Sequence, residues 1–395
     1  MTRISTRLRA QVRRWVRIRL TCGRHQILLS EFDASVMSKS ELIAVSRSGD
    51  PVAYIVRSIV FGCLGAIDIV RREPQVCLSR EGRHILYLSL RTGFDYRDVT
   101  SLRRSPVGQG VGYLREIVAR PRRSEYRDWN NCYVGSRQVN DKYLFNRIVG
   151  QAQLPVPHQF RVYKLPAFFD ADDGGRIVFC GADIPVGEWM LKTRLGMQGE
   201  QVWRCRSLAV SASSISFNSR MQSVPADLTE SLARGELIAE EWLSPDSAFA
   251  ECGDTALPTI RVVTLALSRI TVITKVLFRG ALGSHVSNWR RGGLVYEIRE
   301  DGTCGTGYDH SGLAHGECPV SLTAELLTKV DHMCIAAHQC FPCVGSVGWD
   351  VGLSANGPVL LEGNANWGMG IPQLFPGLPL LRTFQDHCSH ERWGP

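Results

Sequence analysis

The chain has 395 residues, of which 44% are hydrophobic and 21% are charged, and this is typical of a soluble globular protein with roughly two or three domains. The formal net charge is +8, but the excess comes from arginines that precede the first acidic residue, Glu31. The remainder is formally neutral, which argues against nucleic-acid binding by a broadly basic surface. The most apolar stretch, 53–70, contains Arg57 and Asp68 and predicts a buried helix or strand instead of a membrane span.

The arginine-rich arm, residues 1–24, includes the segment RISTRLRAQVRRWVRIRL. A solvated arm that packs loosely on its own domain is the simplest interpretation. A basic amphipathic helix lying on anionic lipid is a second interpretation, and a targeting or nucleic-acid-binding segment is a third. For the whole chain we expect no nucleic-acid partner, and we keep peripheral contact with the inner face of a membrane, through residues 1–24, as a candidate role.

The chain has thirteen cysteines, an odd number without a framework spacing. They indicate free thiols in a reducing compartment, so we expect a cytoplasmic protein. One cluster lies in DHMCIAAHQCFPC and contains His332, Cys334, His338, Cys340 and Cys343. The last two have zinc-knuckle spacing, but no second pair completes a four-ligand site. Cysteines lining a helix are the favoured interpretation, and a metal or redox site is the alternative.

The sequence assigns no role to a first region, residues 1–130, which closes with a polar connector at 120–129. Asn140 or Asp141 can then cap a helix that ends near Gly150. The elements predicted after it are strand-like runs around a glycine-containing loop within 177–203, strands at 236–243, 259–267 and 292–298, and a helix at 320–338. Interleaved strands and helices indicate an α+β or α/β fold.

The stretch GWDVGLSANGPVLLEGN, residues 348–364, predicts a β-hairpin because Asn356-Gly357 is a turn signal between two apolar runs. With these two residues alone as the loop, Asp350 would pair with Gly363 and lie on the opposite face from Glu362. With a three-residue loop that starts one residue earlier and has a left-handed glycine, Asp350 lies opposite Glu362. We predict the three-residue loop because it sorts the side chains by polarity. One face would then carry Trp349, Val351, Leu353, Val359 and Leu361, and the other would carry Asp350, Gly352, Leu360, Glu362 and Asn364.

Asp350, Glu362 and Asn364 are the predicted metal ligands. Two carboxylates and an amide oxygen on one sheet face suit a hard cation, and Mg²⁺ is usually shared between one or two carboxylates and substrate phosphates. A glycosidase carboxylate pair is an alternative, but carboxylates on one sheet face would approach the same side of a sugar instead of flanking its bond. A solvent-facing polar strand face is the other alternative, and it would not require the apolar neighbours.

The same stretch resembles the C-terminal metal-binding signature of ATP-grasp enzymes. It is most similar to the sugar-transfer-associated ATP-grasp group, which is related to α-L-glutamate-ligase-like proteins, and the resemblance covers roughly residues 135–375. It implies an ATP-grasp fold of class α+β (α/β), in which two α+β subdomains clasp the nucleotide. The nucleotide-binding subdomain would be 131–250 and the C-terminal subdomain with the metal site 251–395, after an N-terminal mixed or helical region, 1–130.

The resemblance also implies phosphate-binding residues. Lys142, which follows Asp141 at a helix start, would reach the nucleotide phosphates. Lys192, at the end of a strand, would contact the α- and β-phosphates beneath a loop with Gly196 and Gly199, where flexible backbone can approach phosphate closely.

Further residues would hold the base, the ribose and the transferring group. In LIAEEWLSPDS, the resemblance implies an adenine edge and a ribose contact made by Glu240, Glu241, Leu243 and Asp246. Arg261 would hold the acyl phosphate or γ-phosphate, since an arginine inside an apolar strand needs an anionic partner. Asn288 resembles a family position that usually follows an aspartate, but Ser287 stands in that place here.

These residues together imply an ATP- and Mg²⁺-dependent carboxylate–amine ligase, in which Mn²⁺ can substitute and Arg261 and Lys192 are catalytic. Its partners would be ATP and small-molecule carboxylate and amine substrates, joined through an acyl phosphate, with a link to glycan or surface-polymer biosynthesis. A phosphotransferase with a hydroxyl acceptor is one alternative. A non-catalytic nucleotide-binding protein of an assembly system is another.

Overall fold

The computed structural model describes residues 51–96, 98–99, 132–162, 168–171, 177–180, 185–195, 202–208, 230–231, 233–234, 236–252, 254–266, 269–280, 287–289, 292–310 and 313–375. By its internal contacts the chain divides into two compact units, 1–124 and 125–395. The arm 1–24, with its candidate membrane contact, lies outside the described residues.

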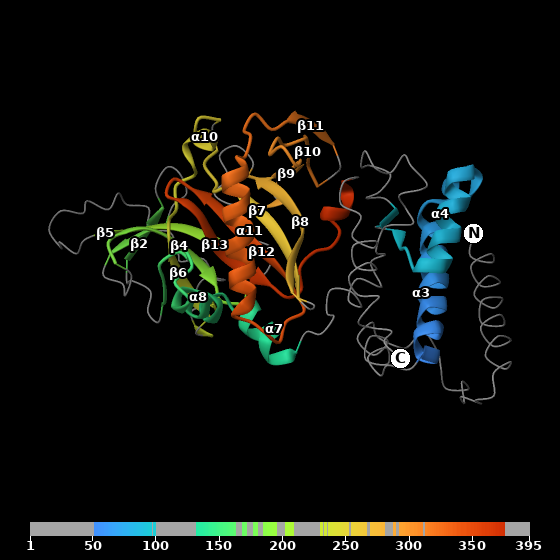
Figure 1. The fold of residues 1–395 in the computed structure, drawn as a ribbon, viewed down its shortest axis with the longest axis horizontal. Helices are drawn as coiled ribbons and strands as arrows, with labels where there is room; N and C mark the ends of the chain where they lie inside the picture. The colour runs from blue at the N-terminus through green and yellow to red at the C-terminus, as the bar shows by residue number, and fades with distance from the viewer. Residues whose placement is uncertain are drawn as a thin grey trace. The chain divides into compact units, whose positions relative to one another are not determined.

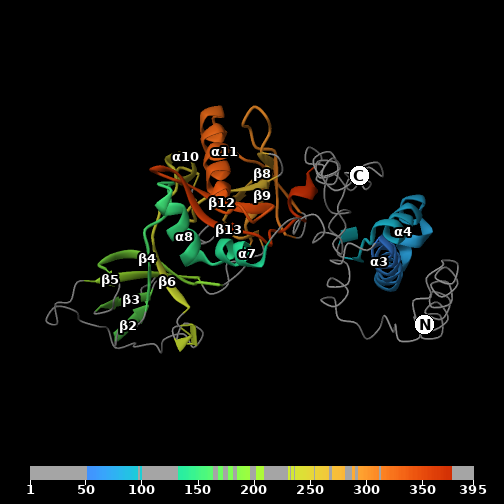
Figure 2. The same ribbon diagram turned by 60° about the horizontal axis from the view of Figure 1, so that its bottom comes forward.

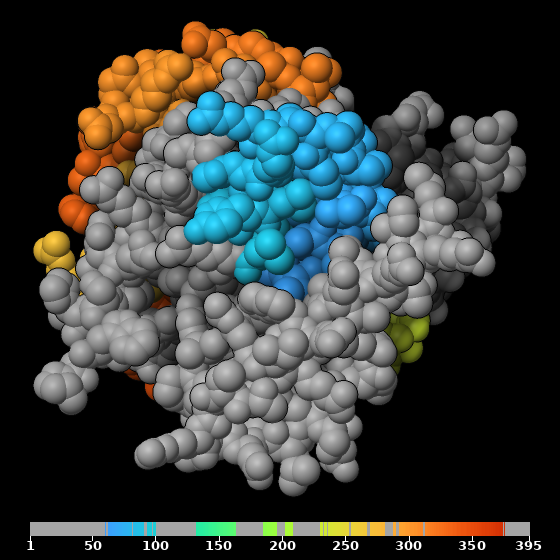
Figure 3. Space-filling model, turned by 90° about the vertical axis from the view of Figure 1, so that its right-hand side faces the viewer, coloured from blue at the N-terminus to red at the C-terminus, as the bar shows by residue number. Residues whose placement is uncertain are grey.

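The first unit contains helix α3 (Pro51–Arg72), the short 3₁₀ helix η2 (Pro74–Leu78) and helix α4 (Arg80–Thr92). The apolar stretch 53–70 therefore lies in α3. Side chains of all three elements, among them Ile69, Val76 and Leu88, are buried together. Figure 3 shows α3 and α4 side by side at the surface of this unit. Among the described helices of the chain, none combines the length and the apolarity that crossing a membrane requires.

The second unit contains two β-sheets (Figures 1 and 2). The first has the order β1-β6-β4-β5-β3-β2, and its described strands pair antiparallel except for β3 with β5. Its strands are β1 (Gln159–Arg161), β2 (Phe168–Ala171), β3 (Ile177–Cys180), β4 (Gly187–Thr193), β5 (Val202–Leu208) and β6 (Leu237–Glu241). The strands predicted within 177–203 and at 236–243 are thus confirmed as β3, β4 and β6, whereas β5 only begins within the predicted range and continues beyond it.

The second sheet has the order β11-β10-β9-β8-β7-β12-β13, with antiparallel neighbours throughout its described strands. Its strands are β7 (Thr259–Ala266), β8 (Ile270–Arg279), β9 (Leu294–Glu297), β10 (Thr306–Tyr308), β11 (Ala314–Glu317), β12 (Ser346–Ser354) and β13 (Gly357–Asn364). The strands predicted at 259–267 and 292–298 are confirmed as β7 and β9. Two short helices flank these strands in the sequence: α10 (Ser247–Ala250) lies between β6 and β7, and η7 (Pro372–Leu374) follows β13.

Helix α11 (Ala324–Gln339) packs across β7, β8, β12 and β13 and covers the second sheet in Figure 1. Its buried face includes Leu327, Val330 and Met333. The predicted helix began too early, because the hydroxyl of Thr323 accepts a hydrogen bond from the backbone N–H of Leu326 and caps the helix there.

Helices α7 (Tyr133–Asn140) and α8 (Lys142–Gln151) precede the first sheet in the sequence. Asp141 caps α8 as predicted, since its carboxylate accepts hydrogen bonds from two backbone N–H groups of the first turn. Helix α8 contacts β1 of the first sheet and β13 of the second, while α7 contacts β13. Phe145 and Val149 of α8 belong to the same buried core as Trp349 of β12. Helix α8 therefore joins the two sheets.

The hairpin of β12 and β13 corrects part of the prediction. Asp350 lies opposite Glu362 as expected, but the turn is the two residues Ala355 and Asn356, and Gly357, with φ of +103°, already pairs with Ser354. An extra residue in β13, inserted where the register shifts after Asp350, restores the expected pairing.

Between the turn and the β-bulge, the side chains of β13 point to the opposite faces from those predicted. Leu360 pairs with Val351 and is fully buried in the core, whereas Leu361 and Val359 are only partly buried. The predicted faces were therefore correct for β12 and for Glu362 and wrong for these three residues, because a bulge inverts the alternation of side chains on one side of it.

Of the predicted cluster in DHMCIAAHQCFPC, Cys334 and His338 are buried in this core, whereas His332 and Cys343 are exposed. The ring of His338 donates from Nε2 to the backbone oxygen of Val344 (2.6 Å) and accepts at Nδ1 from the hydroxyl of Thr264 (2.7 Å). Trp349 donates from Nε1 to the same hydroxyl (2.7 Å). Burial lowers the pKa of His338. Across the described ranges, no three His, Cys, Asp or Glu side chains form a group that could hold a metal ion.

Candidate active site

A row of three ionisable side chains crosses the second sheet. Asp350 on β12 is paired in register with Arg261 on β7 and with Glu362 on β13, so all three side chains point to one face. Arg261 binds Asp350 with both arms of its fork, Nε to Oδ1 at 2.5 Å and Nη2 to Oδ2 at 2.8 Å. The predicted arginine and the two predicted carboxylates are therefore brought together by strand register.

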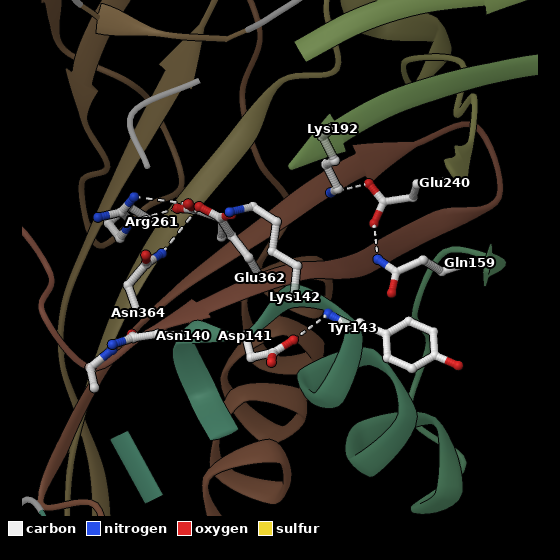
Figure 4. A network of polar contacts seen from close by, with 12 residues as sticks. Asn140, Asp141, Lys142, Tyr143, Gln159, Lys192, Glu240, Arg261, Glu362 and Asn364 are labelled. Atoms are coloured by element: carbon white, nitrogen blue, oxygen red, sulfur yellow. Dashed lines mark hydrogen bonds and ion pairs between the residues drawn. The ribbon is translucent and has the colours of Figure 1, made fainter. Parts of the chain in front are cut away.

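Glu362 is surrounded by nitrogen groups (Figure 4). Its Oε2 lies 3.3 Å from the Nζ of Lys142, and its Oε1 accepts a hydrogen bond of 3.2 Å from the amide of Asn364. Burial alone would raise the pKa of Glu362, but the charges of Lys142 and Lys192 outweigh burial and hold that pKa below its usual range. This carboxylate is therefore ionised at neutral pH and faces both predicted phosphate lysines.

Asp350 has the opposite shift. Burial is the main cause, and the nearby Glu362 adds to it, so the pKa of Asp350 rises to about 6 although Arg261 opposes the change. Two carboxylates this close compete for charge, and one of them retains its proton more strongly than a free carboxylic acid does. A divalent cation placed between them would favour ionisation of both.

Lys192 approaches from the first sheet. It lies near the end of β4, pairs in register with Ile238 of β6, and forms an ion pair with Glu240, two residues further along β6. Glu240 also accepts a hydrogen bond of 3.2 Å from Gln159 of β1. The side chains of Lys192 and Glu240 are only 10% and 8% exposed, so this pair is largely desolvated. Figure 4 shows the lysine on the side of the site opposite Arg261.

The donor set fits a hard cation. Asp350 and Glu362 supply carboxylate oxygens, Asn364 supplies an amide 3.2 Å from Glu362, and the side chains of the two acids keep 14% and 26% exposure. Two acidic ligands do not make a closed protein site, and Mg²⁺ usually completes its octahedral shell with water and substrate phosphate. Lys142, Lys192 and Arg261 surround these acids and would be the partners of that phosphate.

The other predicted residues that the structure describes are engaged in contacts of their own. The carboxylate of Glu241 accepts a hydrogen bond from the backbone N–H of His158 (3.0 Å), and that of Asp246 caps helix α10 by accepting from Ala248 N (3.0 Å). Leu243 lies between β6 and α10 and is partly buried. The backbone oxygen of Asn288 accepts from Gly293 N (3.1 Å). Gly196 and Gly199 fall in a segment that the structure does not describe.

Three site residues were not predicted: Asn140, Arg194 and Gln159. Asn140 accepts a hydrogen bond from the backbone N–H of Ala365, the residue after β13, and Arg194 binds Asp141. The position of Arg194, two residues after Lys192, was a signal that sequence analysis could have used. Gln159 gave no such signal, because its partner Glu240 is brought to it by pairing between strands far apart in sequence.

Comparison with known proteins identifies the family. A model of the family described as sugar-transfer associated ATP-grasp matches residues 121–388. No curated protein matches the sequence.

Solved structures similar to the chain include an N5-carboxyaminoimidazole synthase from Aspergillus clavatus, at 13% identity and TM-score 0.32, over 60% of this chain and 46% of that one. They also include a D-alanine–D-alanine ligase from Bacillus anthracis, at 12% identity and TM-score 0.35, over 66% of this chain and 71% of that one. A third is an L-amino acid ligase from Bacillus licheniformis, at 14% identity and TM-score 0.33, over 59% of this chain and 42% of that one. The chain spans less than half of the synthase and of the amino acid ligase. The family match, in contrast, covers both sheets and every described residue of the candidate active site, and the predicted ATP-grasp fold is confirmed. The chain therefore belongs to the sugar-transfer associated ATP-grasp family.

Proposed function

We propose that this protein is an ATP- and Mg²⁺-dependent ligase that joins a carboxylate to an amine through an acyl phosphate. The observation that carries the proposal is the convergence of Lys142, Lys192 and Arg261 on Asp350 and Glu362. Three cations, one from helix α8 and one from each sheet, lie around two acids of the second sheet. This matches what phosphoryl transfer requires, which is positioning of the phosphates and neutralisation of their charge.

In this proposal each side chain has one task. Lys142 and Lys192 bind the phosphates of ATP, and Arg261 stabilises the charge on the transferring γ-phosphoryl group. Asp350, Glu362 and Asn364 hold Mg²⁺, which neutralises phosphate charge when bound. A carboxylate oxygen of the substrate attacks the γ-phosphorus and ADP leaves. The amine then attacks the acyl carbon, phosphate leaves, and the nitrogen releases a proton. No covalent intermediate with the protein is required.

The remaining assignments are part of the same proposal. The segment from Glu240 to Asp246 lies on and after β6, beside Lys192, and we assign the adenine and ribose contacts to it. The family description links these proteins to sugar transfer, and we therefore place sugar acids and amino acids first among candidate substrates.

The test is a nucleotide-turnover screen. Purified protein is incubated with ATP and Mg²⁺ against sets of amino acids and sugar acids, singly and in carboxylate–amine pairs, and ADP, AMP and phosphate are measured separately. We expect ADP and phosphate in equal amounts only when a carboxylate and an amine are both present. AMP as the product, or a phosphorylated product without an amide, would refute the ligase assignment.

Matched variants link turnover to the site. Glu362→Gln and Asp350→Asn each remove one negative charge and should lower turnover at least about 100-fold, as loss of a charge-stabilising group does. Asp331→Asn is the control, because Asp331 pairs with Lys275 on the α11 side of the sheet (2.8 Å). The control should retain full turnover, and equal losses in all three variants would contradict the proposed roles.

A further inference from the structure

Three consecutive residues at the junction of α7 and α8 contact separate walls of the candidate active site. Asn140 accepts a hydrogen bond of 2.8 Å from the backbone N–H of Ala365, which directly follows β13. Asp141 binds Arg194, which directly follows β4, and Lys142 pairs with the carboxylate of β13 described above. This segment therefore contacts β13, which carries the predicted metal ligands Glu362 and Asn364, and the residue that directly follows β4, the strand of Lys192.

The contact between Asp141 and Arg194 is short and largely buried. The Nε of Arg194 donates to both carboxylate oxygens at 2.7 Å, and its Nη2 lies 2.5 Å from Oδ2. The Asp141 side chain is only 8% exposed and also caps α8 through the N–H groups of Tyr143 and Leu144 (3.2 Å each). An ion pair with this many bonds has one geometry, and it fixes the two chain segments against each other.

The backbone strengthens the same junction. The N–H of Lys142 donates to the carbonyl of Arg194 (3.1 Å), and the N–H of Arg194 donates to the carbonyl of Glu236 just before β6 (2.6 Å). Arg194 is thus bound to the start of α8 twice, through the side chain of Asp141 and through the main chain of Lys142.

The junction sets the distance between two lysines. Asp141 is the neighbour of Lys142 in sequence, and Arg194 is two residues from Lys192. The two lysines come from different elements, α8 and β4, yet both act on the charge of Glu362. A shift of β4 relative to α8 would move Lys192 away from that carboxylate. The Asp141–Arg194 pair opposes such a shift, together with the main-chain hydrogen bond from Lys142 to Arg194.

We propose that Asp141 and Arg194 are positioning residues that hold Lys142 and Lys192 at the separation that nucleotide phosphates require. This inference rests on the proposed function, because the ligand is the triphosphate of Mg-ATP. Neither residue need touch the nucleotide. They affect nucleotide affinity through the two lysines. This role is additional to the contribution that a helix cap and an ion pair make to the stability of the fold.

The experiment measures the dissociation constant of a non-hydrolysable ATP analogue with Mg²⁺ by calorimetry, together with the melting temperature, for the full chain. Arg194→Met removes the pair, and Asp141→Asn removes its charge while keeping an oxygen that can cap the helix. We expect both variants to weaken binding roughly 10- to 100-fold, as a misplacement of about 1 Å does. Arg194→Lys, which keeps the charge without the fork, should fall between them and the wild type.

The control is Arg147→Met. Arg147 lies on the same helix, with its guanidinium 5.9 Å from the centre of the Tyr143 ring, and Arg194 lies 5.8 Å from that ring. The control removes the same charge from the same neighbourhood without touching Asp141, so its binding constant should stay within about twofold of the wild type, since exposed charges contribute little. An equal loss in Arg147→Met would reduce the effect to general electrostatics and overturn the proposal.

A double variant separates positioning from stability. If Arg194 acts through Lys142, then Arg194→Met should cost little further affinity in a Lys142→Met background, whereas a merely structural role would cost the same in both backgrounds. Unchanged binding in Arg194→Met and Asp141→Asn overturns the positioning role alone. Failure of the wild type to bind the analogue overturns the proposed function and this inference with it. Should Arg194→Met not fold, Asp141→Asn and Arg194→Lys replace it, both in the comparison with the wild type and in the Lys142→Met background.

Discussion

The ion pair between Lys192 and Glu240 allows a stability prediction that does not depend on any ligand. Lys192→Met would leave Glu240 buried with one remaining side-chain partner among the residues that the structure describes, Gln159 at 3.2 Å. Breaking a buried pair costs roughly 3–5 kcal/mol, because a charge is left uncompensated in a poorly solvated site. The bond from Gln159 places the expected cost at the lower end, about 3 kcal/mol, or a melting temperature lower by roughly 6–12 °C.

Removing the stranded charge should restore most of that loss. In the double variant Lys192→Met with Glu240→Gln, the residue on β6 is neutral and can still bond to Gln159, so we expect a net cost of about 1 kcal/mol. Thermal unfolding of the full chain, followed by circular dichroism, measures both variants. Lys275→Met is the control, since its partner Asp331 is 29% exposed and such pairs contribute about 1 kcal/mol or less.

Two results would refute this reasoning. A melting temperature for Lys192→Met equal to that of the wild type would mean that Glu240 finds solvent or a proton without cost. A double variant no more stable than the single one would mean that the loss comes from packing of the lysine stem and not from the charge.

Three further predictions concern the hairpin. The pKa of Asp350 is about 6, against 3.8 for an unperturbed aspartate, so between these values the folded state keeps a proton that the unfolded state loses. Melting temperatures should therefore fall as pH rises from about 4.5 to 6. An Asp350→Asn variant should lack this part of the pH dependence. Gly348→Ala should destabilise the protein by about 1–3 kcal/mol in urea unfolding, since its Cβ would lie 2.4 Å from the Cβ of Trp367; an unchanged midpoint would show that Trp367 moves aside freely. Chelation of Mg²⁺ should abolish tight binding of an ATP analogue to the wild type but leave the weak binding of Glu362→Gln nearly unchanged, as calorimetry with and without chelator would reveal; equal losses would remove Glu362 from the metal site.

Local sequence signals predicted much of this fold. The cap at Asp141 and the strands β6, β7 and β9 follow from residue type and alternation, which act over a few positions. The pairing of Asp350 with Glu362 was predicted from a three-residue loop, whereas the structure reaches it through a two-residue turn and a β-bulge. The row of Arg261, Asp350 and Glu362 was harder to predict from the sequence, since it depends on how β7 aligns with β12.

Long-range pairing accounts for what the sequence did not reveal. The adenine contact of Glu240 stays a prediction, but the contacts of its carboxylate with Lys192 and Gln159 were not foreseen, because they depend on the pairing of β6 with β4 and β1. The link from α8 to both sheets likewise depends on tertiary packing. Periodicity within one strand carries no information about the register of its neighbours.

The bulge in β13 separates two registers within a single hairpin. From the turn to Leu360, each residue of β13 faces a partner set by the tight loop, while Glu362 and Asn364 follow a register displaced by one. An alignment of related sequences anchored on the Asn-Gly turn would therefore assign position 361 as the partner of Asp350 and misplace the acid by one residue. The motif should instead be anchored on the acids, with one residue of variable identity allowed between the core leucine and the glutamate.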